Sequence, residues 1–181
     1  MKFEVMLPKM DFRLGIGEHT VNLSHFFPVL SEEPPAFSSV GDPFPAERAD
    51  YTFSLTAPAS YDIICGFEGE TAESNGRKTL SVRAENVREV AFVLAEGMTC
   101  TKGEADGTPV EYWHFRKDAS AERSAAAGSL SYFGEQFGEY VYPKYVVVET
   151  DLPFGGSEQT ALSFVSSSLR GDDLIAAVVH E

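Results

Sequence analysis

The last two residues of the chain, His180 and Glu181, are the first candidates for chemistry. They follow the apolar segment 174–179, which is typical of a helix. In the motif H-E-x-x-H, two histidines one helical turn apart bind zinc, and the glutamate polarises the metal-bound water. A lone histidine on an apolar helix is more often a structural side chain. The pair alone therefore leaves both interpretations open.

A glycine-containing segment, Gly155-Gly156-Ser157-Glu158-Gln159, is the second candidate. Because glycine has no side chain, a substrate backbone can approach such a loop closely and meet the carboxylate of Glu158. The competing interpretation is an ordinary glycine turn between two strands, with an exposed acidic residue. Taken alone, the segment favours the turn.

The composition is that of an acidic globular protein. The chain has 181 residues, 43% of them hydrophobic, and its 28 Asp and Glu against 14 Lys and Arg give a formal net charge of -14. These values exclude a disordered chain, a collagen-like repeat and a disulfide scaffold. They also argue against nucleic acid as a partner, because phosphate binding needs clustered Lys and Arg, whereas an acidic surface attracts cations.

Alternating apolar residues predict short strands in the first two-thirds of the chain. The pattern occurs at 3–7, 51–55, 63–65, 80–82, 90–94 and 110–115, with turn-forming residues between these segments. Short strands at such spacing indicate an antiparallel β-sandwich. The stretch 31–45, rich in Pro, Ser and Gly, predicts a long surface loop.

The pattern changes near residue 118. The segment 119–137 is rich in alanine, and its larger apolar residues predict one apolar helical face made of Leu130, Phe133 and Phe137. Strands are predicted at 145–149 and 162–165, before the final helix. This order of elements is typical of an α+β unit.

We therefore expect a mainly β chain with two parts. Residues 1–117 form an N-terminal β domain that is incomplete at its start, and residues 118–181 begin a second domain that is cut off within its last helix. No apolar run is long enough to span a membrane, and the start has no signal-peptide core. A cytoplasmic location is slightly favoured, and a secreted or surface-anchored one stays open if a signal is missing. Cys65 and Cys100 are expected to be free thiols, although one disulfide stays open.

Together, the two candidate segments resemble the M1 family of zinc aminopeptidases. The matching segments are, in order, Phe137-Gly138-Glu139-Tyr140-Val141-Tyr142-Pro143-Lys144, the strand to Val148, Phe154-Gly155-Gly156-Ser157-Glu158-Gln159, and Val178-Val179-His180-Glu181. Family members have an f-G-x-Y-x-Y-P-K helix exit, a G-x-M-E-N substrate loop and the H-E-x-x-H helix in this order. Segments 26–30, 41–44, 49–53 and 57–58 are similar to the saddle-like N-terminal β domain of bacterial members.

The resemblance implies a thermolysin-like catalytic domain in an enzyme that removes N-terminal residues from peptides. His180 would be a zinc ligand and Glu181 the general base. Glu158 would bind the free α-ammonium group of the peptide, and the backbone of Gly155 and Gly156 would line the substrate. The resemblance implies zinc in the intact enzyme. Because one histidine cannot hold catalytic zinc, we expect no zinc and no activity in this chain alone.

The sequence departs from the family pattern at three positions. Ser157 replaces the usual Met, Gln159 replaces Asn or Tyr, and Val146 replaces an Asp that often follows the Tyr-Pro-Lys segment. The second histidine of the motif, the later Glu ligand and the catalytic Tyr are absent, so we expect an interior fragment of a larger enzyme. Two alternatives stay open: a non-catalytic β-sandwich binding module, and a degenerate M1-like pseudoenzyme.

Overall fold

Two antiparallel sheets form the first part of the protein, in a computed structural model that describes residues 1–29 and 47–181. The predicted loop at 31–45 and the matching segment 41–44 lie outside the described residues, as does residue 30. The four-stranded sheet has the order β1 (Gly15–Ile16), β2 (Thr20–Leu23), β7 (Phe92–Ala95) and β4 (Asp62–Ile64). The three-stranded sheet has the order β3 (Ala49–Pro58), β6 (Arg77–Val87) and β5 (Gly69–Ser74).

An aromatic core lies between these two sheets. Phe92 of β7 is fully buried, and the ring of Phe53 on β3 packs edge-on against it with centroids 5.5 Å apart. The rings of Phe26 and Phe27 lie 6.2 Å and 4.9 Å from that of Phe53. Two antiparallel sheets that share a core form a β-sandwich. The predicted mainly β class with antiparallel sheets is confirmed.

A third sheet follows, and it is mixed rather than antiparallel. Its order is β11 (Gly156–Gln159), β12 (Leu162–Ser166), β10 (Tyr145–Thr150), β9 (Thr108–His114) and β8 (Thr99–Ala105). The central strand β10 runs parallel to β9 and β12, whereas β8 and β11 are antiparallel edge strands. Strands β8 and β9 lie before residue 117 in the chain, yet they belong to this sheet. The domain boundary between residues 117 and 118 stays a prediction.

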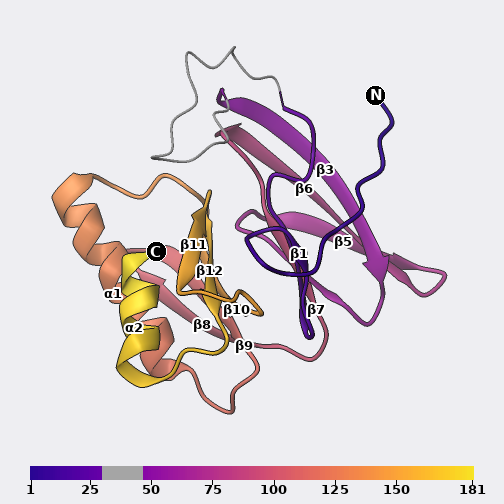
Figure 1. The fold of residues 1–181 in the computed structure, drawn as a ribbon. Helices are drawn as coiled ribbons and strands as arrows, with labels where there is room; N and C mark the ends of the chain where they lie inside the picture. Colours follow the sequence, from indigo (N-terminus) through magenta and orange to yellow (C-terminus); the bar gives the residue numbers. More distant parts are fainter. Residues whose placement is uncertain (30–46) are drawn as a thin grey trace, which may run out of the picture.

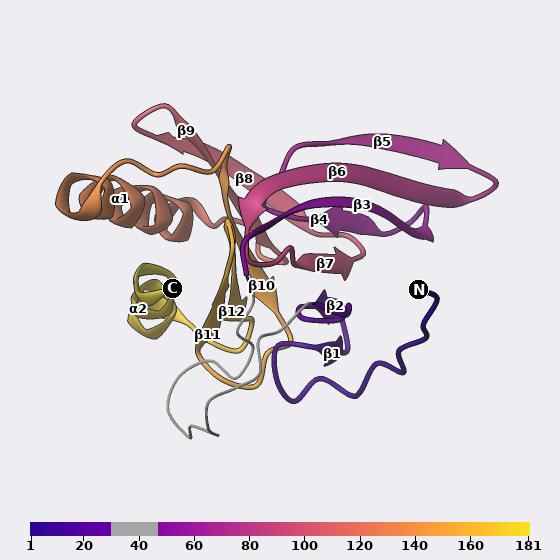
Figure 2. The same cartoon turned by 90° about the horizontal axis from the view of Figure 1, so that it is seen from above.

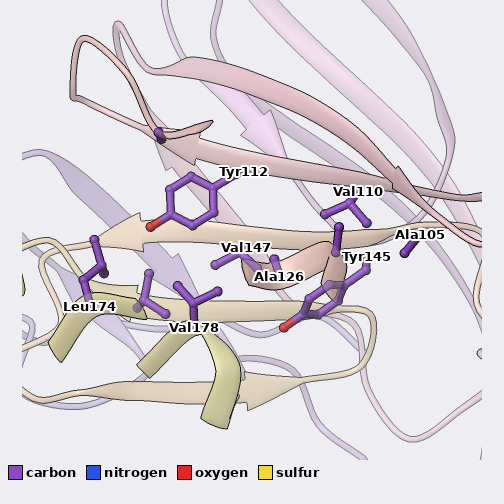
Figure 3. Close-up of a cluster of buried hydrophobic side chains, with 11 residues drawn as sticks. Ala105, Val110, Tyr112, Ala126, Tyr145, Val147, Leu174 and Val178 are labelled. Carbon is purple, nitrogen blue, oxygen red and sulfur yellow. The ribbon is translucent and has the colours of Figure 1, made fainter. Parts of the chain in front are cut away.

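Both helices, α1 (Ser120–Phe137) and α2 (Gly171–His180), cover one face of the third sheet (Figures 1 and 2). Figure 3 shows Val147 and Tyr145 of β10 in one cluster with Leu174 and Val178 of α2 and Ala126 of α1. Successive side chains of a strand point to opposite faces. The next residues on β10 therefore belong to a different core.

The opposite face of the third sheet packs against the sandwich. Val146 and Val148 of β10 share a core with Ile64 of β4 and Val93 of β7. All six residues of β10 are buried, as expected for a parallel strand covered on both sides. This strand joins the sandwich and the helical layer into one structure.

Two predicted features are wrong. Residues 3–7 form no strand, and Phe3 and Val5 are about half-exposed, because no neighbouring strand pairs with this segment in the described part of the chain. The predicted apolar face of α1 is wrong for Phe133 and Phe137, which are exposed, whereas Leu130 packs partly buried against the core. The buried residues of this helix are Ala126 and Ala127, whereas Phe137 is 84% exposed. Small side chains let the helix approach the sheet closely, and the two phenylalanines are left exposed.

Both cysteines, Cys65 and Cys100, are free thiols, as the sequence predicts. Burial raises the pKa of Cys100 to about 11. Neither of the helices found within the described ranges is long and apolar enough to cross a membrane.

A buried ion pair ties the third sheet to the helical layer. The side chain of Glu149 on β10 is 2% exposed and accepts hydrogen bonds from Arg116 Nε at 2.6 Å and from the Tyr112 hydroxyl at 3.1 Å. Arg116 also donates to the backbone oxygen of Leu169 at 2.9 Å and lies 3.7 Å from Glu122 of α1. Burial raises the pKa of Glu149, and the nearby Arg116 opposes this rise.

We predict that Arg116→Ala lowers the free energy of unfolding by about 3–5 kcal/mol, because it leaves a carboxylate buried without its partner. Arg83→Ala is the control, since the Arg83–Glu85 pair is exposed and its loss should cost less than about 1 kcal/mol. Chemical denaturation measures both variants. Equal losses would show that the buried pair does not anchor the helical layer.

Candidate functional site

A cavity of about 380 Å³ lies where the edge of the third sheet meets the sandwich. Residues from β11 and β12, from the end of α2, from the segment before β10 and from the β6–β7 connection line it. Its polar lining includes Glu89, Tyr140, Tyr145, Glu158, Thr160 and Glu181. Two of the predicted site residues, Glu158 and Glu181, therefore share one cavity.

The edge strand β11 positions Glu158. The predicted glycine turn is a strand from Gly156 onward, because its residues pair with β12, with Glu158 opposite Ser163. Side chains alternate along the strand. Ser157 and Gln159 are buried, whereas Glu158 between them is exposed and lines the cavity.

Helix α2 brings Glu181 to the same place. Leu174 and Val178 are fully buried against the third sheet and fix the helix. The backbone N–H of Glu181 donates to the oxygen of Ala177 at 3.0 Å, so the helical hydrogen bonding continues to this residue. The hydroxyl of Ser163 on β12 donates to the backbone oxygen of Glu181 at 3.4 Å. Glu181 is thus held over the strand that pairs with β11.

Gly156 leaves the space that the Glu181 side chain fills. A β-carbon at this position would lie 2.6 Å from Cγ and 2.7 Å from Cδ of Glu181, closer than any side chain tolerates. A β-carbon at Gly155 would have no neighbour within 4 Å. The backbone oxygen of Gly155 accepts a hydrogen bond from the N–H of Ser166 at 2.9 Å. Of the two predicted glycines, only Gly156 is therefore required for close approach.

The two carboxyl groups are electrostatically coupled. Burial is the largest cause that raises the pKa of Glu181 to about 7, and the charge of Glu158 and a hydrogen bond with it raise it further. The charge of His180 acts in the opposite direction. Two carboxylates in contact resist simultaneous ionisation. Glu181 therefore exchanges its proton near neutral pH, and a positively charged group beside the pair would favour the ionised form of both carboxyls.

Tyrosines form the wall of the cavity beside this pair. The hydroxyl of Tyr145 lies 2.9 Å from that of Ser163, and burial raises the pKa of Tyr145 to about 12. The ring of Tyr140 lies 6.1 Å from that of Tyr145 and 5.4 Å from that of Tyr142. Aromatic rings attract cations through their faces. Acidic and aromatic groups together suit a cationic ligand.

His180 is placed differently from the other predicted residues. It is exposed in the last turn of α2 and does not line the cavity that holds Glu158 and Glu181. Residues 1–29 and 47–181 contain no group of three His, Cys, Asp or Glu side chains that could hold a metal ion. His180 therefore offers one imidazole, and the described chain does not bring further ligands to it.

Sequence reasoning missed several residues of the site, among them Ser163, Tyr145 and Glu89. Ser163 stands inside an apolar strand, and a polar residue at a buried strand position is a detectable signal. Glu89 gave no such signal, because its role depends on Thr160, which lies 71 residues away. The sequence assigned no role to His25, which lies next to Glu89.

We predict that Glu158→Gln lowers the pKa of Glu181 from about 7 toward its ordinary value of 4.5, because it removes the adjacent negative charge. Titration of the Glu181 carboxyl carbon by NMR measures this value, and Glu70→Gln on the exposed strand β5 is the matched control. Since the folded-state pKa is raised, this group favours folding fully below about pH 4.5 and progressively less up to about pH 7. An unchanged pKa in Glu158→Gln would contradict the coupling.

We predict that Gly156→Ala displaces the Glu181 side chain while the fold stays intact. The new methyl group would overlap a flexible side chain rather than backbone, so the free energy of unfolding should change by less than about 1 kcal/mol. The pKa of Glu181 should fall, because its carboxyl moves into water. Gly155→Ala is the control and should leave that pKa unchanged. The same pKa of Glu181 in Gly156→Ala and Gly155→Ala would show that Gly156 is not needed to accommodate the Glu181 side chain.

No known protein-family model matches this sequence, and no curated protein matches it. Among solved structures, the chain is similar to two crystal structures of a two-domain M1 zinc metallopeptidase mutant, one bound to L-arginine and one bound to L-tryptophan. The first has a TM-score of 0.57 and 18% identity over 75% of this chain and 34% of that chain. The second has a TM-score of 0.54 and 19% identity over the same shares.

These similarities show a shared fold. The chain spans about a third of the length of the structures that it matches, since 34% of each is covered. The resemblance drawn from the sequence motifs is thereby supported at the level of the fold.

Proposed function

We propose that this chain is part of a zinc-dependent aminopeptidase that removes N-terminal residues from peptides. The observation that carries the proposal is the convergence of Glu158 and Glu181 at one cavity, with Gly156 leaving space for the Glu181 side chain. The two carboxylates come from an edge strand and from the end of a helix, and both line the same cavity. The fold shared with M1 metallopeptidase structures supports the same function.

Glu158 is proposed to bind the α-ammonium group of the peptide. Its exposed carboxylate lines a cavity of about 380 Å³ with tyrosine walls. A charge-assisted hydrogen bond between an ammonium and a carboxylate is roughly twice as strong as a neutral one. An N-terminal amine beside the pair would favour the ionised form of both carboxyls. Because Glu158 would bind a charged N-terminal amine, the proposed substrate is a peptide with a free N-terminus.

The edge position of β11 suits an extended peptide. β11 pairs with β12 along one side and is the outermost strand of its sheet. An exposed sheet edge binds extended peptides through backbone hydrogen bonds. A peptide added along β11 would pass the Glu158 side chain, because that residue faces the cavity. The backbone of Gly155 and Gly156 is proposed to line this path.

Glu181 is proposed as the general base. A pKa of about 7 lets this carboxyl accept and return a proton near neutral pH. Its contact with Glu158 and its burial are the two causes of that value. The same residue would therefore be weaker as a base if Glu158 were neutral.

His180 is proposed as one ligand of the zinc ion of the intact enzyme. Its imidazole is exposed at the end of α2, one residue before the proposed base, which fits the first position of H-E-x-x-H. Bound zinc supplies a Lewis acid that polarises a carbonyl and activates water. The other ligands are proposed to come from a continuation of this helix. We accordingly propose that the chain by itself holds no stoichiometric zinc.

The two-part organisation is retained in the proposal, with an N-terminal β domain over residues 1–117 and the start of a catalytic domain over residues 118–181. A non-catalytic binding module and a pseudoenzyme remain the competing functions. A binding module predicts no second motif histidine after His180 and Glu181. A pseudoenzyme predicts a continuing helix without that histidine.

In the protein that carries the full H-E-x-x-H helix, we predict that Glu158→Ala raises KM for L-leucine p-nitroanilide by about 10-fold or more, because an ammonium–carboxylate contact is worth about 1.5–3 kcal/mol. Glu70→Ala, an exposed residue of β5, is the control and should leave KM unchanged. The N-acetylated substrate should not be cleaved. Equal KM values for the two variants, or cleavage of the acetylated substrate, would exclude an N-terminal anchor at Glu158.

A further inference from the structure

A hydrogen-bonded chain of polar side chains connects the sandwich to the turn beside Glu158. Glu89, in the β6–β7 connection, accepts hydrogen bonds at Oε1 from both the backbone N–H and the hydroxyl of Thr160, each at 2.8 Å. Its other oxygen lies 3.2 Å from Nε2 of His25. Burial raises the pKa of Glu89, but the hydrogen bonds from His25 and Thr160 outweigh it and hold the pKa below its ordinary value. Glu89 is therefore a carboxylate.

A second arm starts from the same histidine. Nδ1 of His25 lies 2.8 Å from the hydroxyl of Ser24, and that hydroxyl donates to Oε1 of Gln159 at 2.7 Å. The amide nitrogen of Gln159 donates to the hydroxyl of Ser157 at 3.2 Å. Ser24, Ser157 and Gln159 are all buried. The two arms therefore hold the residues on both sides of Glu158.

The turn between β11 and β12 contains a strained residue, so contacts from other parts of the chain are needed to stabilise it. β11 and β12 are joined by only Thr160 and Ala161, and Ala161 has a φ of 61°, in the left-handed region. This conformation strains a residue other than glycine, because its β-carbon crowds the following carbonyl oxygen. The hydrogen bonds from Thr160 to Glu89 fix the residue before the strained position.

We propose that Ser24, His25 and Glu89 form a positioning relay that fixes the β11–β12 hairpin to the sandwich and thereby places the Glu158 carboxylate at the cavity. Ser24 and Glu89 are hydrogen-bonded to the strand and the turn that carry Glu158, and His25 joins them to each other. Glu89 also lines the cavity, whereas Ser24 and His25 do not. The consequence for ligand binding rests on the proposed function, whereas the positioning itself does not.

The relay also accounts for two departures from the family pattern. Ser157 and Gln159 stand where the family usually has Met and Asn or Tyr. Here both are buried polar residues that are hydrogen-bonded to each other and, through Gln159, to Ser24. Buried polar groups are stable only when such partners are present. The two substitutions thus fit a connected network rather than a decayed site.

The test compares Glu89→Ala with Glu89→Gln by NMR on the 181-residue chain. Glu89→Ala should speed amide hydrogen exchange at Thr160 by about tenfold or more, because its acceptor is lost. It should also abolish the nuclear Overhauser contacts between the side-chain methylenes of Glu158 and Glu181. Glu89→Gln should largely restore both signals, since its amide oxygen still accepts from Thr160.

The matched control is Glu111→Ala. Glu111 is a carboxylate of similar burial, with a side chain 14% exposed against 19% for Glu89, and it pairs with Lys144 away from the hairpin. It should leave the Glu158–Glu181 contacts intact. Ser24→Ala removes the other arm alone and should weaken the same contacts. Persistence of these contacts in both Glu89→Ala and Ser24→Ala would overturn the relay.

Binding of L-leucinamide separates this proposal from the proposed function. If the wild-type chain binds L-leucinamide, Ser24→Ala should weaken binding about tenfold although Ser24 does not line the cavity, and equal affinity would overturn the relay. If the wild-type chain does not bind it and the Glu158–Glu181 contacts are still lost in Glu89→Ala, the proposed function fails and the relay stands.

Discussion

The structure depends on the burial of strand β10 on both of its faces. Val146 and Val148 pack with the sandwich, whereas Tyr145 and Val147 pack with the helices. A strand of this kind cannot shift by one residue, because such a slip would exchange its two faces. The buried Glu149, paired with Arg116, adds a charged anchor at the end of the same strand. The orientation of every neighbouring element follows from this central strand.

The cavity is a consequence of that arrangement at the edge of the sheet. β12 lies next to β10 and carries β11 as the last strand, so the exposed edge comes to lie beside the β6–β7 connection. Helix α2 packs on the same sheet and ends over Ser163, which places Glu181 against Gly156. The coupled carboxyl pair therefore results from the packing of three elements. Its chemistry, a carboxyl group with a pKa raised to about 7, results from burial and from like charge.

Much of the fold could be predicted from local patterns. Alternating residues in β3 and the apolar run of β10 identify strands, because their side chains meet one or two cores wherever they pair. The segment 3–7 shows the same alternation and forms no strand, since pairing needs a partner that local sequence does not specify. The predicted α1 face was wrong at Phe133 and Phe137 for a similar reason. The close packing of Ala126 outweighs the size of Phe137, and only the shape of the sheet decides this.

The site could be predicted only in part. Glu158 and Gly156 were identifiable because glycines beside an acidic residue resemble a known loop. The partners of this strand were not, because Ser24 lies 135 residues from Gln159 and Glu89 lies 71 residues from Thr160. His180 remains an assignment from the motif, since the described chain supplies no further ligand to it.

The proposed function depends on Glu158 binding an α-ammonium group beside the carboxyl group of Glu181. Titration of the chain with L-leucinamide and with N-acetyl-L-leucinamide, followed by NMR at the Glu158 and Glu181 carboxyl carbons, tests it most directly. We expect saturable shifts at both carboxyls with the free amine and none with the acetylated compound. Equal responses to the two compounds, or shifts confined to residues outside the cavity, would contradict it.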